Sequence, residues 1–81
     1  MEELVKTIVL PIVTNKEAVM VKLMPAIEGE PLEVVVIADK TDIARLIGKG
    51  GAVADAIREV VSIKARLDGK RFRVKFESYD E

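Results

Sequence analysis

The 81-residue sequence contains no cysteine and no histidine. Without cysteine the chain can form neither disulfides nor thiolate metal sites. Without histidine it lacks the usual zinc ligand and the usual general base near neutral pH. The serine and threonine residues therefore have no evident activator for nucleophilic catalysis. Asp39 and Asp42 lie at a predicted helix start, and we interpret them as capping groups rather than a catalytic pair. We expect no catalytic residue, no metal and no cofactor.

Aromatic residues are also scarce, at 4% of the chain. Phe72 and Phe76 fall on the apolar face of a predicted strand, so the sequence does not support a domain that stacks bases on sheet aromatics. No apolar run approaches the length of a membrane span, and the opening residues MEELVK are acidic, unlike a secretory signal. We therefore expect a soluble, cytoplasmic protein without membrane association.

The charged residues are unevenly distributed, although the formal net charge is only −1. Residues 1–39 carry three basic and seven acidic side chains, whereas residues 40–76 carry ten basic and four acidic ones. The distribution of charge matters more for nucleic-acid binding than its sum, so the basic segment favours a polyanionic partner. A solvated surface of mixed charge is the alternative interpretation.

Hydrophobic residues make up 49% of the sequence, which is enough for one packed domain over residues 1–81. Apolar spacing and turn residues predict six elements in the order α-β-β-α-α-β, which is typical of a two-layer α+β domain. Pro11 should kink or shorten the first helix, and Thr41 or Asp39 should cap the second. The first two strands should form an antiparallel hairpin. The predicted elements are a helix over 2–13, strands over 18–26 and 32–38, helices over 42–47 and 51–67, and a strand over 71–76.

Three glycines and a lysine, GKGG at residues 48–51, separate the two central helices. One glycine is enough to end a helix, so three of them indicate a turn that a ligand approaches closely. The spacing does not fit a Walker A loop, because Lys49 is followed by Gly50, Gly51 and Ala52 where that motif requires serine or threonine directly after the lysine. It does not fit a dinucleotide fingerprint either, because Val53 occupies the position of the third glycine. A loop without side chains, followed by the N-terminus of a helix, suits a phosphate backbone.

The GKGG loop between two helices, with Ile47 before it and Ala54 and Ile57 after it, resembles the KH motif. The element order, the chain length, the opening EELVKTIV and the helix GGAVADAIREVV resemble the small stand-alone bacterial KH-domain RNA-binding proteins, the KhpA type. The resemblance implies a single type II KH domain, with a three-stranded sheet covered on one face by helices. It also implies that the GxxG loop at 48–51 clamps about four backbone nucleotides of single-stranded RNA.

By this resemblance, the RNA groove lies between the two helices flanking the loop and the edge of the second strand. Its apolar floor would be formed by Ile43, Ile47 and Ala54, with Val36 and Ile37 as candidates from the strand. Arg45 and Lys49 would contact phosphates, with Lys40 and Arg58 at the margins, whereas Ile57 and Val60 are interpreted as core. The expected RNA-binding residues are Gly48, Lys49, Gly50, Gly51, Arg45, Ile47, Ala54, Arg58, Lys40 and Ile43.

The last strand carries a separate basic stripe of Arg71, Arg73 and Lys75. This stripe should face away from the helices, because side chains alternate along a strand. We interpret it as a solvated face of the sheet, or as a secondary RNA contact, rather than as the main site.

Two other functions fit parts of the sequence. A helix-turn-helix binder of duplex DNA would also have two helices joined by a glycine turn, but its recognition helix would begin AVADAI, which offers almost nothing to read base edges. A protein-interaction module with incidental RNA binding is the stronger alternative. The family resemblance implies a homodimer, or a complex with a larger Jag-type KH-containing protein, and links the pair to RNA chaperone activity and to control of the cell wall and cell length. RNA is not distinguished from single-stranded DNA by the loop, which grips phosphates that both possess.

Overall fold

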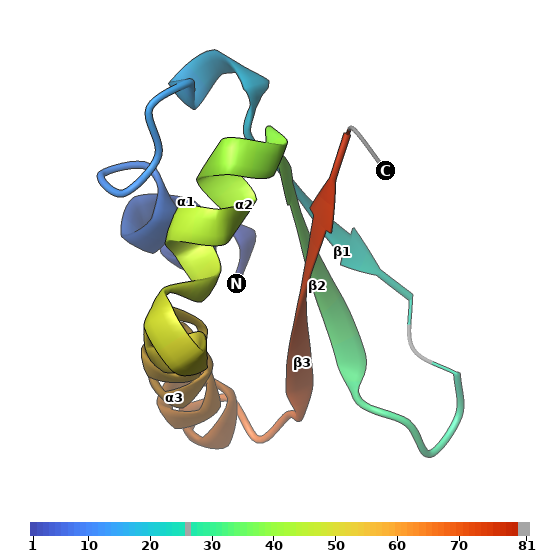
Figure 1. Cartoon of the computed structure of the whole chain (residues 1–81). Coiled ribbons are helices and arrows are strands. Elements are labelled where there is room, and N and C mark those ends of the chain that lie inside the picture. Colours follow the sequence, from blue (N-terminus) through green and yellow to red (C-terminus); the bar gives the residue numbers. More distant parts are fainter. Residues whose placement is uncertain (26, 80–81) are drawn as a thin grey trace.

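A computed structural model of the chain describes residues 1–25 and 27–79 (Figure 1). Ala26, the last residue of the first predicted strand, lies outside them, as do the last two residues of the acidic tail. The order of helices and strands is the predicted one. The elements are α1 (Glu2–Val9), the 3-10 turn η1 (Lys16–Ala18), β1 (Met20–Met24), β2 (Leu32–Ala38), α2 (Lys40–Ile47), the 3-10 turn η2 (Lys49–Gly51), α3 (Ala52–Leu67) and β3 (Phe72–Ser78).

The three strands form one sheet in the order β1-β2-β3. β1 and β2 are antiparallel, as the predicted hairpin requires, with Val21 opposite Val36. β2 and β3 are parallel, with Val34 beside Val74, because α2 and α3 carry the chain across one face before β3 returns to the sheet. The helices lie on that one face (Figure 1), so the expected α+β architecture of a single KH domain is confirmed.

α1 is shorter than the helix predicted over 2–13, because it ends at Val9. Leu10 still has helical dihedral angles, and Pro11 follows immediately, where its missing N–H and fixed ring stop a helix from continuing. The Glu2 carboxylate at the other end accepts a hydrogen bond of 3.1 Å from the Leu23 backbone N–H of β1. The proline thus shortens α1 and leaves it docked beside the hairpin.

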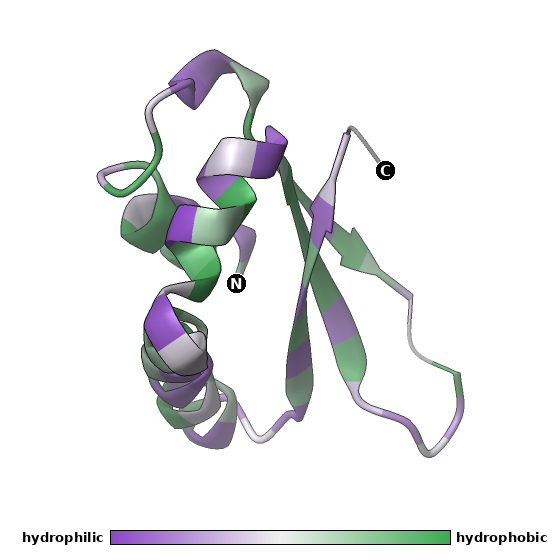
Figure 2. Cartoon of the chain, viewed as in Figure 1, coloured by the Kyte–Doolittle hydropathy of each residue, from purple (hydrophilic) through white to green (hydrophobic). Residues whose placement is uncertain are grey.

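The core lies between the sheet and the three helices. Figure 2 shows β2 as a mostly hydrophobic strand with one hydrophilic band. The hydrophobic character is expected of a strand in the centre of a sheet. The α3 residues Ile57 and Val61 are buried, but Val60 is 43% exposed, so its assignment to the core was wrong. Val60 falls on the outer side of α3, where the sheet does not reach. The buried cluster comprises Val5, Val9, Val13, Val34, Val36, Leu46, Ile57, Val61 and Val74.

Asp42 is a buried carboxylate that ties α2 to the segment after α1. Its Oδ1 accepts 2.9 Å hydrogen bonds from the backbone N–H and hydroxyl of Thr14, and its Oδ2 accepts a 3.0 Å bond from the backbone N–H of Asn15. Asp42 therefore caps a neighbouring segment rather than its own helix. Asp39 occupies the N-cap position of α2, as predicted, but its side chain accepts a bond from the Asn15 side chain instead of capping.

The same contacts set the charge state of Asp42. The backbone N–H of Thr14, followed by that of Asn15, lowers the pKa of the Asp42 carboxyl from its usual value, because both donors favour the ionised form. Burial opposes this shift, while the Thr14 hydroxyl and the Arg45 guanidinium, 3.7 Å away, add to it. The ionised carboxylate fixes the position of α2, and with it the loop that follows α2.

Candidate nucleic-acid interface

The GKGG loop turns the chain sharply between α2 and α3. Gly48 ends α2 with φ of 74°, and its N–H donates to the Ala44 carbonyl at 3.0 Å. A Cβ atom at Gly48 would lie only 2.5 Å from Cγ2 of Val53, so α3 begins in direct contact with the backbone of this glycine. The Gly51 N–H donates to the Gly48 carbonyl at 3.1 Å and closes the turn. Gly48 is therefore required by the packing of the loop itself.

The next residues of the loop have open space around them. A Cβ atom on Gly50 or Gly51 would meet nothing within 4 Å, and Lys49 is exposed. Gly51 is the N-cap of α3, so the positive end of the helix dipole lies at this turn. The loop can therefore bring a phosphate close to backbone N–H groups and to the Lys49 ammonium group.

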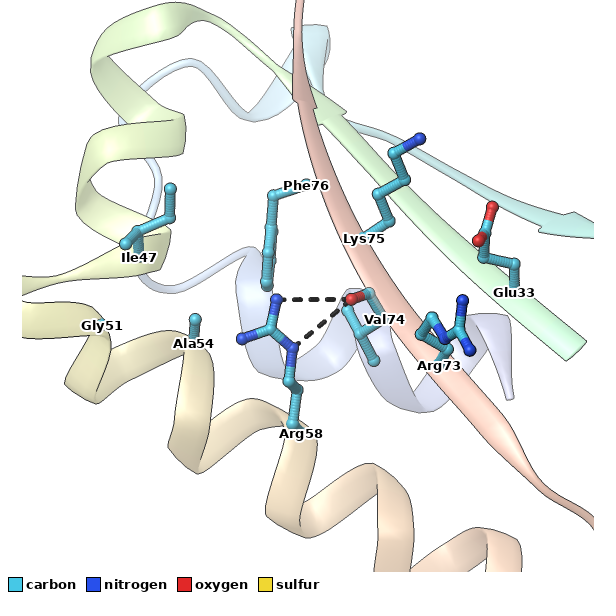
Figure 3. Close-up of a pocket in the computed structure, with 9 residues that line it drawn as sticks. All are labelled: Glu33, Ile47, Gly51, Ala54, Arg58, Arg73, Val74, Lys75 and Phe76. Atoms are coloured by element: carbon cyan, nitrogen blue, oxygen red, sulfur yellow. Dashed lines mark hydrogen bonds between the residues drawn. The ribbon is translucent and has the colours of Figure 1, made fainter. Parts of the chain in front are cut away.

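A groove of about 470 Å³ runs from the loop between α3 and β3 (Figure 3). The helices contribute an apolar side that contains Ile47 and Ala54, and β3 contributes Val74 and Phe76 opposite them. Such a surface of small and apolar side chains, bordered by cations, suits unstacked bases beside a held backbone. The groove is lined by Glu33, Ile47, Gly51, Ala54, Arg58, Arg73, Val74, Lys75 and Phe76.

β3 supplies most of the strand residues that line the groove, and β2 contributes Glu33. β2 is the central strand of the sheet and has a neighbour on each edge. Val36 is fully buried in the core, and neither Val36 nor Ile37 lines the groove. The free edge beside α3 belongs to β3, because the parallel crossover places this strand last in the sheet.

Arg58 spans the groove from α3 to β3. Its Nε and one terminal nitrogen donate 3.4 Å hydrogen bonds to the Val74 carbonyl, and its guanidinium lies 5.5 Å from the centre of the Phe76 ring (Figure 3). A third nitrogen lies 3.8 Å from the Asp55 carboxylate. These contacts hold the charge over the apolar wall, where a phosphate or a base can meet it.

Sequence reasoning did not assign Val74 and Phe76 to the groove, nor Arg73 and Lys75 to its rim. Figure 3 shows Arg73 and Lys75 on the far side of the β3 ribbon from Arg58, which confirms that the basic stripe points away from the helices. They still border the groove, because β3 is an edge strand and the hollow reaches its rim. The alternation of RFRVKF was the available signal, but it did not reveal which strand lies at the edge.

Three predicted contacts outside the GKGG loop do not line the groove. Ile43 is half-buried and packs against the core cluster. Arg45 is half-exposed on α2, beside Asp42. Lys40 is in the first turn of α2, about 10 Å along the helix axis from Ile47. The structure thus brings together the loop, Ile47, Ala54 and Arg58, and it leaves these three on other parts of α2.

The part of the chain that the structure describes contains neither a cluster of metal ligands nor a helix suited to a membrane. Over residues 1–25 and 27–79, no three acidic side chains gather where they could hold a metal ion. None of the helices in these ranges combines the length and the apolar character that crossing a bilayer requires.

Comparisons with known proteins cover almost all of the chain. A model of the family described as KhpA/KhpB, KH domain, matches residues 2–76. The chain is 35% identical over 75 residues to the RNA-binding protein KhpA of Listeria monocytogenes serovar 1/2a, with 93% of this chain and 96% of the relative covered. The RNA-binding protein KhpA of Listeria innocua serovar 6a matches to the same extent. Each match includes the groove and the loop.

Proposed function

The chain belongs to the KhpA/KhpB family of KH domains, and on that premise we propose that it is a non-catalytic protein that binds single-stranded RNA. The strand backbone lies across the loop at 48–51, and the bases enter the groove between α3 and β3. The two relatives from Listeria are named RNA-binding proteins, and the match covers 96% of each, which supports this assignment.

The observation that carries the proposal is the open loop at the mouth of an apolar groove. Gly50 and Gly51 leave space for a phosphate, and Lys49 supplies a mobile positive charge beside it. Ala54 leaves the groove wide where the first base would enter, and Arg58 lies further along. This division of labour, with phosphates at the loop and bases in the groove, is how KH domains bind single strands.

Duplex DNA binding through a helix-turn-helix fits this arrangement poorly. The first turn of α3 would have to enter the major groove, but Ala54 is 2% exposed and packs toward β3. The exposed side chains at the start of α3 are Ala52, Asp55 and Ala56, which offer almost nothing to read base edges.

The test is fluorescence anisotropy with a short labelled single-stranded RNA across a salt series. The loop variant is Lys49→Asp, Gly50→Asp; it should fold, because Gly50 has open space and aspartate tolerates a left-handed backbone. The matched control is Lys22→Asp, Thr7→Asp, which changes the net charge equally on α1 and β1. Binding that weakens with salt, survives in the control and disappears in the folded loop variant supports the clamp.

Equal binding by the wild type and the loop variant, or no binding by the wild type, would contradict the proposal. A second arm replaces the RNA with single-stranded DNA of the same sequence. A stronger response to RNA would indicate contacts with 2′-hydroxyl groups, whereas equal affinities would indicate that phosphates and bases dominate. Circular dichroism of each variant separates loss of binding from loss of fold.

A second candidate function, protein interaction, is favoured by an exposed apolar stripe on α3. Val60, Ile63 and Leu67 are 43%, 53% and 79% exposed, and their three- and four-residue spacing places them on one side of the helix. Arg58, which lines the groove, lies on a different side, so RNA and protein could bind together. This surface is a candidate for pairing two copies or for a Jag-type KH partner.

Sedimentation of the wild type and of an Ile63→Asp variant tests the second candidate. A wild-type dimer that becomes monomeric in the variant, with RNA binding by each subunit retained, supports it. Monomers in both samples contradict self-association, and the stripe would then be tested against the Jag-type partner. The RNA chaperone role and the link to the cell wall and cell length stay predictions from the family.

A further inference from the structure

A second hollow, of about 430 Å³, lies at the end of α3 farthest from the GKGG loop. Half of its eight lining residues are cationic and none is acidic, which distinguishes it from the groove, where Glu33 is present. We call it the basic pocket. It is lined by Pro31, Ser62, Ala65, Arg66, Lys70, Arg71, Phe72 and Arg73.

The cations of the basic pocket are mostly unpaired. Within residues 1–25 and 27–79, no ion pair involves Arg66, Lys70 or Arg73. Arg71 donates a 3.0 Å hydrogen bond to the Gly29 carbonyl, which uses one of its donors and leaves its charge uncompensated. The nearest acid along the chain, Asp68, is paired with Lys64 at 3.3 Å. The register places Glu33 of β2 beside Arg73, so the charges of the pocket without a neighbouring acid among the described ion pairs are those of Arg66, Lys70 and Arg71.

The basic pocket continues the groove rather than forming a separate site. Arg58 of the groove and Ser62 and Arg66 of the pocket follow one another at four-residue steps, so they share one side of α3. Arg73 on β3 lines both hollows. From Ala54 to Arg66, this side of α3 extends about 18 Å. A strand lying in the groove is therefore directed to the pocket.

The chemistry of the pocket suits a phosphodiester. Arginine guanidinium groups bind phosphate oxygens in pairs, and the exposed Ser62 can donate its hydroxyl. We propose that the basic pocket holds a phosphate of the same single strand that the loop clamps, so that the binding site extends along the whole of α3. This inference rests on the proposed function and deepens it.

The basic-pocket variant Arg66→Gln, Lys70→Gln removes two of these charges. Both side chains are exposed, so the fold should be retained, and Arg71 is left intact because it also holds the 27–30 turn. The control is Lys6→Gln, Lys22→Gln, which removes equal charge from α1 and β1. Labelled oligouridylates of about four and about twelve nucleotides serve as probes, because the shorter matches the clamp alone.

We expect the variant to bind the longer RNA about tenfold more weakly than the wild type and to bind the shorter RNA normally. The slope of log affinity against log salt should fall by about 1.4 for the longer RNA, which corresponds to two lost contacts at about 0.7 each. The control should leave both affinities and both slopes unchanged. A longer RNA also offers the clamp more positions at which to bind, which raises affinity without the pocket. The measured quantity is therefore the ratio of the affinities for the longer and the shorter RNA, compared between the variant and the wild type.

Failure of this inference and failure of the proposed function give different results. Suppose that the wild type binds both RNAs, and that affinity rises from the shorter to the longer RNA by the same factor in the variant and the wild type. The basic pocket then has no RNA role, and only this inference is overturned. The same holds if the variant and the control weaken binding of the longer RNA equally. If the wild type binds neither RNA, both are overturned.

Discussion

A side chain on Gly48 would collide with Val53: its Cβ would lie 2.5 Å from Val53 Cγ2 and 2.9 Å from Val53 Cβ. Gly48→Ala should therefore destabilise the fold by about 3 kcal/mol, from overpacking and from a left-handed backbone angle of 74°. Gly50→Ala has a similar angle but open space, and should lose only about 1 kcal/mol. Urea denaturation measures both losses, and equal losses would contradict the close contact with Val53.

Stability should decline in acid because of Asp42. Its pKa in the folded chain is lowered, so its contribution is fully present above the unfolded value of about 3.9 and is lost as the pH falls through the lower folded value. Asp42→Asn should lower the melting temperature at pH 7 by several degrees, because an amide nitrogen would face the N–H groups of Thr14 or Asn15. It should also flatten the dependence of melting temperature on pH below 4. Asp55→Asn, at an exposed position, is the control; an equally flattened profile there would argue against Asp42.

Two leucines offer a matched test of the core. Leu46 is fully buried between α2 and the sheet, whereas Leu67 is 79% exposed at the end of α3. Leu46→Ala should lower the free energy of unfolding by about 3 kcal/mol, and Leu67→Ala should change it by less than about 0.5 kcal/mol. Thermal unfolding should show a fall of roughly 15 °C for the first variant. Comparable losses at both positions would mean that the end of α3 is covered in solution.

Arg58 should contribute to RNA affinity through its charge. Arg58→Gln keeps a hydrogen-bond donor near the Val74 carbonyl but removes the cation above Phe76. The affinity for a short single-stranded RNA should fall about tenfold, or about 1.4 kcal/mol, and the salt slope should fall by about 0.7. Titrations at several salt concentrations measure both effects, with Lys22→Gln as the control. A reduced affinity with an unchanged slope would show that Arg58 acts by packing and not on a phosphate.

Local sequence signals were sufficient for most of the architecture. The run of β-branched residues bounded by a turn and by Asp39 predicted a strand over 32–38, and β2 has those bounds. The glycines of GKGG predicted the turn between two helices, and the alternation of RFRVKF predicted which side of β3 faces the core. In each case the determining interactions lie within a few residues along the chain.

The errors concern interactions between distant parts of the chain. That β3 lines more of the groove than β2 does depends on the parallel pairing across α2 and α3, which no short stretch encodes. Val60 fits the apolar spacing of a buried helix face, but it is 43% exposed, because no other element of the described chain covers that side of α3. Asp42 was predicted to cap its own helix, but the hydrogen-bond partners of its carboxylate lie 27 and 28 residues earlier in the chain.

The position of β3 has a consequence for when the groove becomes complete during synthesis. The loop and α3 leave the ribosome before Val74 and Phe76, so a nascent chain carries the GKGG turn without the opposite wall of the groove. The same strand supplies Val74 to the core. Closing the groove and completing the core therefore both wait for β3, so the complete groove exists only once the chain has been synthesised through Phe76.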